Sequence, residues 1–261
     1  MPDATTDHIA RAFDLRHSFT TFTQRCGGSR VSTMIDHAHD LASVRDATDR
    51  LLTAVAKLDN ASVAEPSRLP GWSRGHILAH LARNADALVN VLRGLPMYAS
   101  GDARDADIER DAPRPLDVQL ADVRDSAARF QEAGAVPGDW SRTVELRNGV
   151  TDSASRVPFR RWVEVELHHV DLGIGYELED VPEEFTEREI EFLADRFAGH
   201  PDVPPTRVTD GTRAWSTGRE AQTPEVTVTG GAADLLGWLA GRRDGSRLTV
   251  SGGPLPALPP L

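Results

Sequence analysis

The chain has 261 residues, with 29 Lys and Arg against 40 Asp and Glu, which gives a formal charge of −11 at pH 7. That charge excludes a general affinity for nucleic acid or anionic membrane, because both require a basic face. No run of about 18 apolar residues is present, so we expect no transmembrane helix. The single cysteine, Cys26, excludes a disulfide framework and a cysteine-based metal site, and it fits a cytoplasmic protein.

Residues 1–33 differ in their residue pattern from the rest of the chain. They show little periodicity and no apolar core of a secretory signal. We expect them to form a flexible leader, or to precede a natural start at Met34. An ordered arm that docks on a partner is the alternative. In the first case, a chain that begins at Met34 should keep its fold, its metal and its activity.

Residues 34–178 carry apolar positions at helical spacing in four segments. Ser73 is a good N-cap for the second of them, and the polar stretch between the second and third reads as a loop containing three prolines. Four helices joined by one long crossover predict a four-helix bundle. The expected helices cover residues 35–58, 73–95, 116–133 and 158–174, and the expected loop covers residues 96–115.

The remainder of the chain, residues 179–261, has the pattern of a second and smaller domain. Short strand-like runs surround a short helix, and an acidic helix precedes them. In the first domain, Asn148-Gly149 between valine-containing runs predicts a hairpin. The expected elements of the small α/β domain are helices over 183–197 and 232–240 and strands over 225–229 and 247–251.

The fourth helix of the bundle carries a line of polar residues. Glu164, His168 and Asp171 share one face, because residues three and four apart are neighbours on a helix, and Arg161 lies one turn before them. A polar line on an otherwise apolar helix needs a reason, since unpaired buried polar groups are costly.

The second helix carries a matching set: His76 and His80 are four residues apart, and Asn84 follows one turn on. A histidine from this helix and a Glu/His pair from the fourth helix could together hold a divalent metal, as bundle cores commonly do. Two imidazoles and one carboxylate with an open position suit catalytic Zn²⁺, and the same set suits Fe²⁺. Core histidines hydrogen-bonded to carboxylates would give the same pattern.

Four stretches resemble the mycothiol-dependent maleylpyruvate isomerases. They are LPGWSRGHILAHLARNA (69–85), Pro96-Met97-Tyr98, EVELHHVDLG (164–173) and LAGR (239–242). They lie far apart in the sequence and keep their order, and the resemblance runs from about Met34 to the C-terminus. The family fold is a DinB-like four-helix bundle followed by a small α/β domain, in agreement with the pattern of the elements.

The resemblance implies roles for individual residues. The family's Zn²⁺ ligands fall on His80, Glu164 and His168, and its functional arginine falls on Arg242. His76 and His169 are then neighbours of the metal rather than ligands.

The implied reaction uses Zn²⁺, or another divalent metal, to lower the pKa of the thiol of mycothiol. The thiolate adds to the conjugated double bond of maleylpyruvate, the resulting single bond rotates, and loss of the thiolate gives fumarylpyruvate. Arg242 would bind a carboxylate of this dianion across an interdomain cleft. In the alternative, Arg242 and Arg243 only interact with the C-terminal dipole of the short helix at the surface.

Three functions therefore remain open: the isomerase, a mycothiol-dependent S-transferase acting on another electrophile, and a non-catalytic metal-binding protein. Met97, Tyr98 and Arg242 favour the isomerase, because a bare metal-binding bundle does not need them. The expected partners are a small dicarboxylate substrate and a low-molecular-weight thiol, with no nucleic acid and no membrane. We expect a cytoplasmic monomer.

Overall fold

The structure, a computed structural model, describes residues 35–260. Within that range the chain divides into two compact units, one ending at Gly175 and the other beginning at Tyr176. The leader expected over residues 1–33 lies outside the described residues. None of the described helices is both long and apolar enough to cross a membrane.

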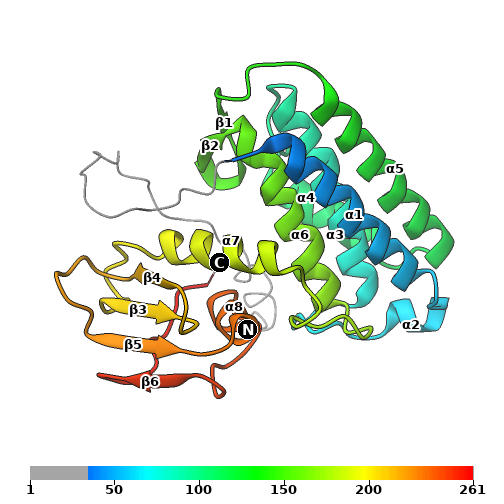
Figure 1. Ribbon diagram of the computed structural model, residues 1–261. Helices are drawn as coiled ribbons and strands as arrows, with labels where there is room; N and C mark the ends of the chain where they lie inside the picture. Colours follow the sequence, from blue (N-terminus) through cyan, green and yellow to red (C-terminus); the bar gives the residue numbers. More distant parts are fainter. Residues whose placement is uncertain (1–34, 261) are drawn as a thin grey trace, which may run out of the picture. The chain divides into compact units, whose positions relative to one another are not determined.

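The first unit is a helical bundle, as predicted (Figure 1). Helix α3 is its central element: it packs against α5, α4 and α6, while α1 packs against α6 and α5. The four long helices are α1 (His37–Val55), α3 (Arg74–Leu92), α5 (Leu116–Ala135) and α6 (Val157–Asp171), and two shorter ones are α2 (Asn60–Ala64) and α4 (Gly101–Asp111).

Local sequence explains where α3 begins and which face it buries. Ser73 caps the helix: its Oγ accepts from the backbone N–H of His76, and Nδ1 of His76 accepts from the N–H of Ser73. The apolar stripe expected from the spacing is fully in the core, and each such side chain contributes about 1.5–3 kcal/mol on burial. Its members include Ile77, Leu78, Leu81, Ala85 and Leu88.

The polar loop expected over residues 96–115 is wrong in its middle, where α4 forms. Ser100 caps this helix by accepting from the backbone N–H of Ala103. The segment has few apolar residues, so its periodicity is weak, and α4 buries Arg104 and Asp111 together with Ile108. Packing of charged side chains against the bundle, rather than an apolar stripe, stabilises this helix.

A short antiparallel hairpin precedes α6, as Asn148-Gly149 predicted. Strands β1 (Thr143–Glu145) and β2 (Thr151–Ser153) pair, and a 3₁₀ turn (Arg147–Gly149) joins them. Asn148 and Gly149 have φ values of 60° and 73°, a left-handed conformation that these two residue types adopt most readily.

The second unit contains a four-stranded mixed sheet with two helices. The strand order is β4-β3-β5-β6, in which β3 and β5 are parallel and the outer pairs are antiparallel. The elements are α7 (Glu183–Arg196), β3 (Thr206–Thr209), β4 (Ala214–Thr217), β5 (Val226–Thr229), α8 (Ala232–Leu239) and β6 (Thr249–Ser251).

The predicted small α/β domain is therefore present, with its two expected strands slightly shortened. The sequence did not predict strands β3 and β4, because they follow a run of prolines that is typical of a linker. Val208 of β3 and Val228 of β5 are both completely buried, so the sheet has one well-packed face.

Gly75 offers a test of the contact between α3 and the end of α4. A Cβ built on Gly75 would overlap the carbonyl oxygen of Ala112, which accepts a 2.8 Å hydrogen bond from Nε2 of Gln119. Gly75→Ala should therefore lower the free energy of unfolding by about 1–3 kcal/mol in denaturant titrations. Gly101→Ala, in open space at the start of α4, should leave it unchanged or slightly raised. Equal effects of the two substitutions would contradict this packing.

Candidate metal centre

Helices α3 and α6 bring His80, Glu164 and His168 together. Nε2 of His80 lies 2.9 Å from Oε2 of Glu164, and Nε2 of His168 lies 3.3 Å from the same oxygen. One ligand atom of each residue lies within 4.8 Å of the others. The i, i+4 spacing puts Glu164 and His168 on one face of α6, and His80 reaches them from α3. The structure thus brings together the three residues that the family resemblance indicates.

A second contact joins the same two helices one turn further on. Nη1 of Arg161 donates a 2.7 Å hydrogen bond to Oδ1 of Asn84. The step from His80 to Asn84 goes forward along α3, whereas the step from Glu164 to Arg161 goes backward along α6. The two helices are therefore antiparallel here, and their polar lines face each other along two turns.

The electrostatics of the cluster suit a metal-binding set. Burial lowers the pKa of His80 to about 4, although Glu164 opposes that effect, so its imidazole is neutral at pH 7. Burial would raise the pKa of Glu164, but the hydrogen bonds with His168 and His80 hold that pKa well below its usual range. A neutral imidazole and an ionised carboxylate are the forms that bind a divalent cation.

His168 is oriented by Asp171. Nδ1 of His168 lies 2.9 Å from Oδ2 of Asp171, and both side chains are fully buried. Burial lowers the pKa of His168, but the hydrogen bonds with Asp171 and Glu164 outweigh it and the pKa is raised. The carboxylate places the proton on Nδ1 and leaves Nε2 to face the centre, the usual arrangement behind a metal-ligating histidine.

Arg104 on α4 contacts His80 in the opposite sense, as a donor. Its Nη2 lies 3.2 Å from Nδ1 of His80, and since a guanidinium only donates, Nδ1 is the acceptor. A neutral His80 that binds a metal through Nε2 would carry its proton on Nδ1. This hydrogen bond and metal ligation through Nε2 therefore exclude each other.

Tyr98 borders the cluster. Burial raises the pKa of the Tyr98 hydroxyl, and the charge of Glu164 raises it further. The charge of Arg104, a hydrogen bond from Arg104 and the charge of Arg147 oppose that rise. Tyr98 thus lies near one ligand of the centre and near two arginines. The sequence marked Tyr98 through the family resemblance, but it gave no sign of Arg104, which fell in the predicted loop.

His76 and His169 lie outside the set, as the resemblance implied. His76 contacts Ser73 at the start of α3 and Glu109 at 3.4 Å. His169 is buried on α6, one residue beyond His168. Among the described residues, the one group of three or more His, Cys, Asp or Glu side chains placed to hold a metal is His80, Glu164 and His168.

Arg242 follows α8 in the second unit. Its Nη1 donates a 2.7 Å hydrogen bond to the carbonyl oxygen of Ala240. Arg243 instead forms ion pairs with Glu179 at 2.7 Å and with Asp234 at 2.6 Å. The two adjacent arginines therefore differ in their partners.

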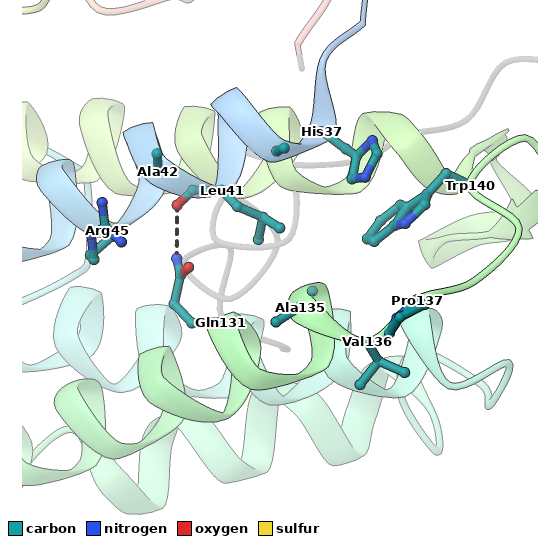
Figure 2. Close-up of a pocket in the computed structure, with 11 residues that line it drawn as sticks. His37, Leu41, Ala42, Arg45, Gln131, Ala135, Val136, Pro137 and Trp140 are labelled. Carbon is teal, nitrogen blue, oxygen red and sulfur yellow. Dashed lines mark hydrogen bonds between the residues drawn. The ribbon is translucent and has the colours of Figure 1, made fainter.

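A groove at one end of α1 and α5 is a separate feature of the bundle. His37 stacks on Trp140 there with ring centroids 4.2 Å apart, and Nε2 of Gln131 donates to the carbonyl oxygen of Leu41 (Figure 2). The groove shares no residue with the His80, Glu164 and His168 set, and no carboxylate lines it. His37 is the one common metal ligand among its lining residues.

The chain thus combines a helical bundle, which carries a His₂Glu set placed to hold a metal on two antiparallel helices, with a small mixed α/β domain. A model described as the mycothiol maleylpyruvate isomerase N-terminal domain matches residues 44–173, and a model of the C-terminal domain of the same family matches residues 180–260. The chain belongs to the mycothiol-dependent maleylpyruvate isomerase family.

Solved structures agree with this assignment. The crystal structure of a mycothiol-dependent maleylpyruvate isomerase is 28% identical in sequence and has a TM-score of 0.76, over 85% of this chain and 95% of that one. A structure of a histidine-to-alanine mutant of a mycothiol-dependent maleylpyruvate isomerase gives the same values. No curated protein sequence matches the chain.

Replacement of the histidines on α3 tests the ligand set. His80→Ala should abolish tight binding of one divalent metal per chain, because it removes one of three donors. His76→Ala should leave most of the binding, since His76 caps the helix instead. Elemental analysis of the purified variants measures both. Full metal occupancy in His80→Ala would refute the assignment.

Proposed function

We propose that the protein is a mycothiol-dependent maleylpyruvate isomerase, which converts the cis dicarboxylate maleylpyruvate into fumarylpyruvate. The observation that carries the proposal is the His80, Glu164 and His168 set, buried between two helices of a bundle whose family uses a thiol cofactor. The similar solved structure, at 28% identity over most of both chains, supports the same reaction.

His80, Glu164 and His168 would hold a divalent cation, for which we propose Zn²⁺. When bound there, the cation lowers the pKa of a thiol so that mycothiol is available as a thiolate nucleophile at neutral pH. The donor set fits: it offers two imidazole nitrogens and one carboxylate oxygen, and leaves positions for an exogenous ligand.

The chain's own residues orient that set. Asp171 fixes the ring of His168. Arg104 would release its hydrogen bond to Nδ1 of His80 when Nε2 of His80 binds a cation. Glu164 keeps 23% of its side chain exposed while both histidines are nearly fully buried, so the centre is accessible on the side of the carboxylate.

Arg242 would bind one carboxylate of the substrate from the second domain. Arg242 is half-buried, and its Nη1 donates to the carbonyl oxygen of Ala240. Arg243 forms ion pairs with Glu179 and Asp234. We keep the expected division into a bundle over residues 34–178 and a small domain over 179–261, and a cytoplasmic monomer, as parts of this proposal.

An S-transferase remains the second candidate, because an activated thiolate also attacks other electrophiles. The two differ in their product. An isomerase releases the thiol after bond rotation, so the thiol is not consumed. A transferase leaves a stable thiol adduct. The Tyr98 and Arg104 pair beside the centre favours the isomerase, since a dicarboxylate needs polar and cationic contacts.

Incubation of the purified protein with maleylpyruvate tests the reaction. Loss of the cis isomer and appearance of fumarylpyruvate should require the thiol, with less than one thiol consumed per turnover. Mycothiol and product are followed by chromatography and mass spectrometry. Accumulation of a thiol adduct would instead identify the transferase, and absence of both products would leave a binding protein.

Arg242→Ala should lower turnover by about one to two decades, because a lost charge-assisted hydrogen bond is worth roughly 1.5–3 kcal/mol when it acts in the transition state. Metal content and folding should stay unchanged. Arg243→Ala should lower the melting temperature through its lost ion pairs and change turnover much less. Equal and small effects of the two substitutions on turnover would show that Arg242 does not bind the substrate.

A further inference from the structure

Arg161 is a buried arginine that forms no ion pair with a carboxylate of the described residues. It lies on α6, one turn before Glu164, and is only 1% exposed. Its Nη1 donates to Oδ1 of Asn84. Its Nε and Nη2 are buried and have no hydrogen-bond partner within residues 35–260.

Such a group is costly to the fold. Burial of an ion without a partner costs several kcal/mol even after relaxation, so buried arginines are normally paired. The adjacent Arg160 follows that rule and lies 2.6 Å from Asp152. Burial lowers the pKa of Arg161 only to about 10, so the guanidinium remains a cation at pH 7. A buried cation left without a carboxylate needs a functional explanation.

The geometry of the free atoms indicates the ligand. Nε–H and Nη2–H lie in the guanidinium plane and point from the same edge of it. They form the fork that binds a carboxylate with two parallel hydrogen bonds. Asn84 holds Nη1, on the other side, and so fixes the direction of the fork. The contact with Asn84 lies one turn from His80, so the fork lies between the two helices that carry the metal ligands.

Both anionic and cationic groups lie near Arg161. The charges of Glu164, Tyr98 and Asp86 act on Arg161, and the charges of Arg104 and Arg147 act on Tyr98. Arg104 also forms an ion pair with Asp105 at 2.6 Å. Nε of Arg147 is also buried without a partner within the described range. Three arginines therefore surround Tyr98 beside Glu164, in a protein of net charge −11. Such a concentration of positive charge stabilises a bound anion.

We infer that Arg161, oriented by Asn84, is a carboxylate-binding site inside the bundle, where it holds one carboxylate of the substrate next to the metal centre. The identification of the anion as a small dicarboxylate rests on the proposed function. A dianion has two carboxylates, so this site is additional to the one proposed for Arg242. Arg161 then sets which end of the substrate faces the centre.

The test uses maleate as the probe, because it is a cis dicarboxylate of similar size, and dimethyl maleate as its uncharged control. Isothermal titration of the full-length protein at fixed ionic strength should show binding of maleate and not of the ester. Arg161→Met should weaken maleate binding tenfold or more, since the two charge-assisted hydrogen bonds are lost. Arg161→Lys keeps a cation without the fork and should also weaken it.

Stability separates this role from a structural one. Without maleate, Arg161→Met should melt at the same or a higher temperature than the wild type, because an unpaired buried charge is removed. The matched control Arg160→Met should melt lower, because it breaks the ion pair with Asp152, yet keep the wild-type affinity for maleate. A lower melting point for Arg161→Met together with unchanged maleate affinity would assign Arg161 to the fold alone.

The outcomes also distinguish this inference from the proposed function. Maleate binding that depends on Arg161, in a protein that does not isomerise maleylpyruvate, would support the anion site and refute the isomerase. Thiol-dependent isomerisation with wild-type kcat and KM in Arg161→Lys would refute the anion site and leave the isomerase intact. Failure of the wild-type protein to bind maleate, or wild-type maleate affinity in Arg161→Lys, would overturn the inference.

Discussion

The meeting of two imidazoles at one carboxylate oxygen is the constraint on which the rest of the bundle depends. Oε2 of Glu164 lies within 3.3 Å of Nε2 of both His80 and His168, so α3 and α6 are connected by charge as well as by packing. Both histidines are nearly fully buried, and burial makes each of their polar atoms require a partner. Asp171 and Arg104 supply those partners, which explains why a charged helix such as α4 packs onto the bundle.

The polar residues of the centre lower the stability of the fold. A neutral His80, an ionised Glu164 and a charged Arg161 occupy positions that apolar residues would fill more favourably. The apolar stripe of α3 and the fully buried Phe130 and Leu51 around it offset that cost. Polar groups of this kind persist in a core when they bind something, and their positions on facing turns of α3 and α6 mark one site rather than several.

Much of this arrangement could be read from the sequence because α3 and α6 have strong helical periodicity. The i, i+4 spacing of Glu164 and His168 indicated one candidate ligand pair, and Ser73 located the start of the helix that carries His80. The choice between His76 and His80 did not follow from spacing, since both lie on the same face. The family resemblance favours His80. In the structure the two histidines differ in their contacts, because His76 is held by Ser73 at the helix start.

Features that depend on contacts distant in the sequence could not be predicted. Helix α4 lacks an apolar stripe and forms through burial of Arg104 and Asp111 against other helices. Strands β3 and β4 are short and follow prolines, and they exist because β3 pairs with β5 and β4. The absence of an ion pair at Arg161 within the described residues likewise depends on its neighbours in space, and no pattern along the chain predicts it.

X-ray absorption at the metal edge of the purified protein tests the central claim most directly. The account predicts a shell of two imidazole nitrogens and carboxylate or solvent oxygens, which gains a sulfur neighbour at about 2.3 Å when mycothiol is added. The same spectrum in His80→Ala should lose the signature of two imidazoles. A spectrum that shows no sulfur with saturating thiol would contradict thiol activation at this centre, and one that keeps two imidazoles in His80→Ala would contradict the ligand set itself.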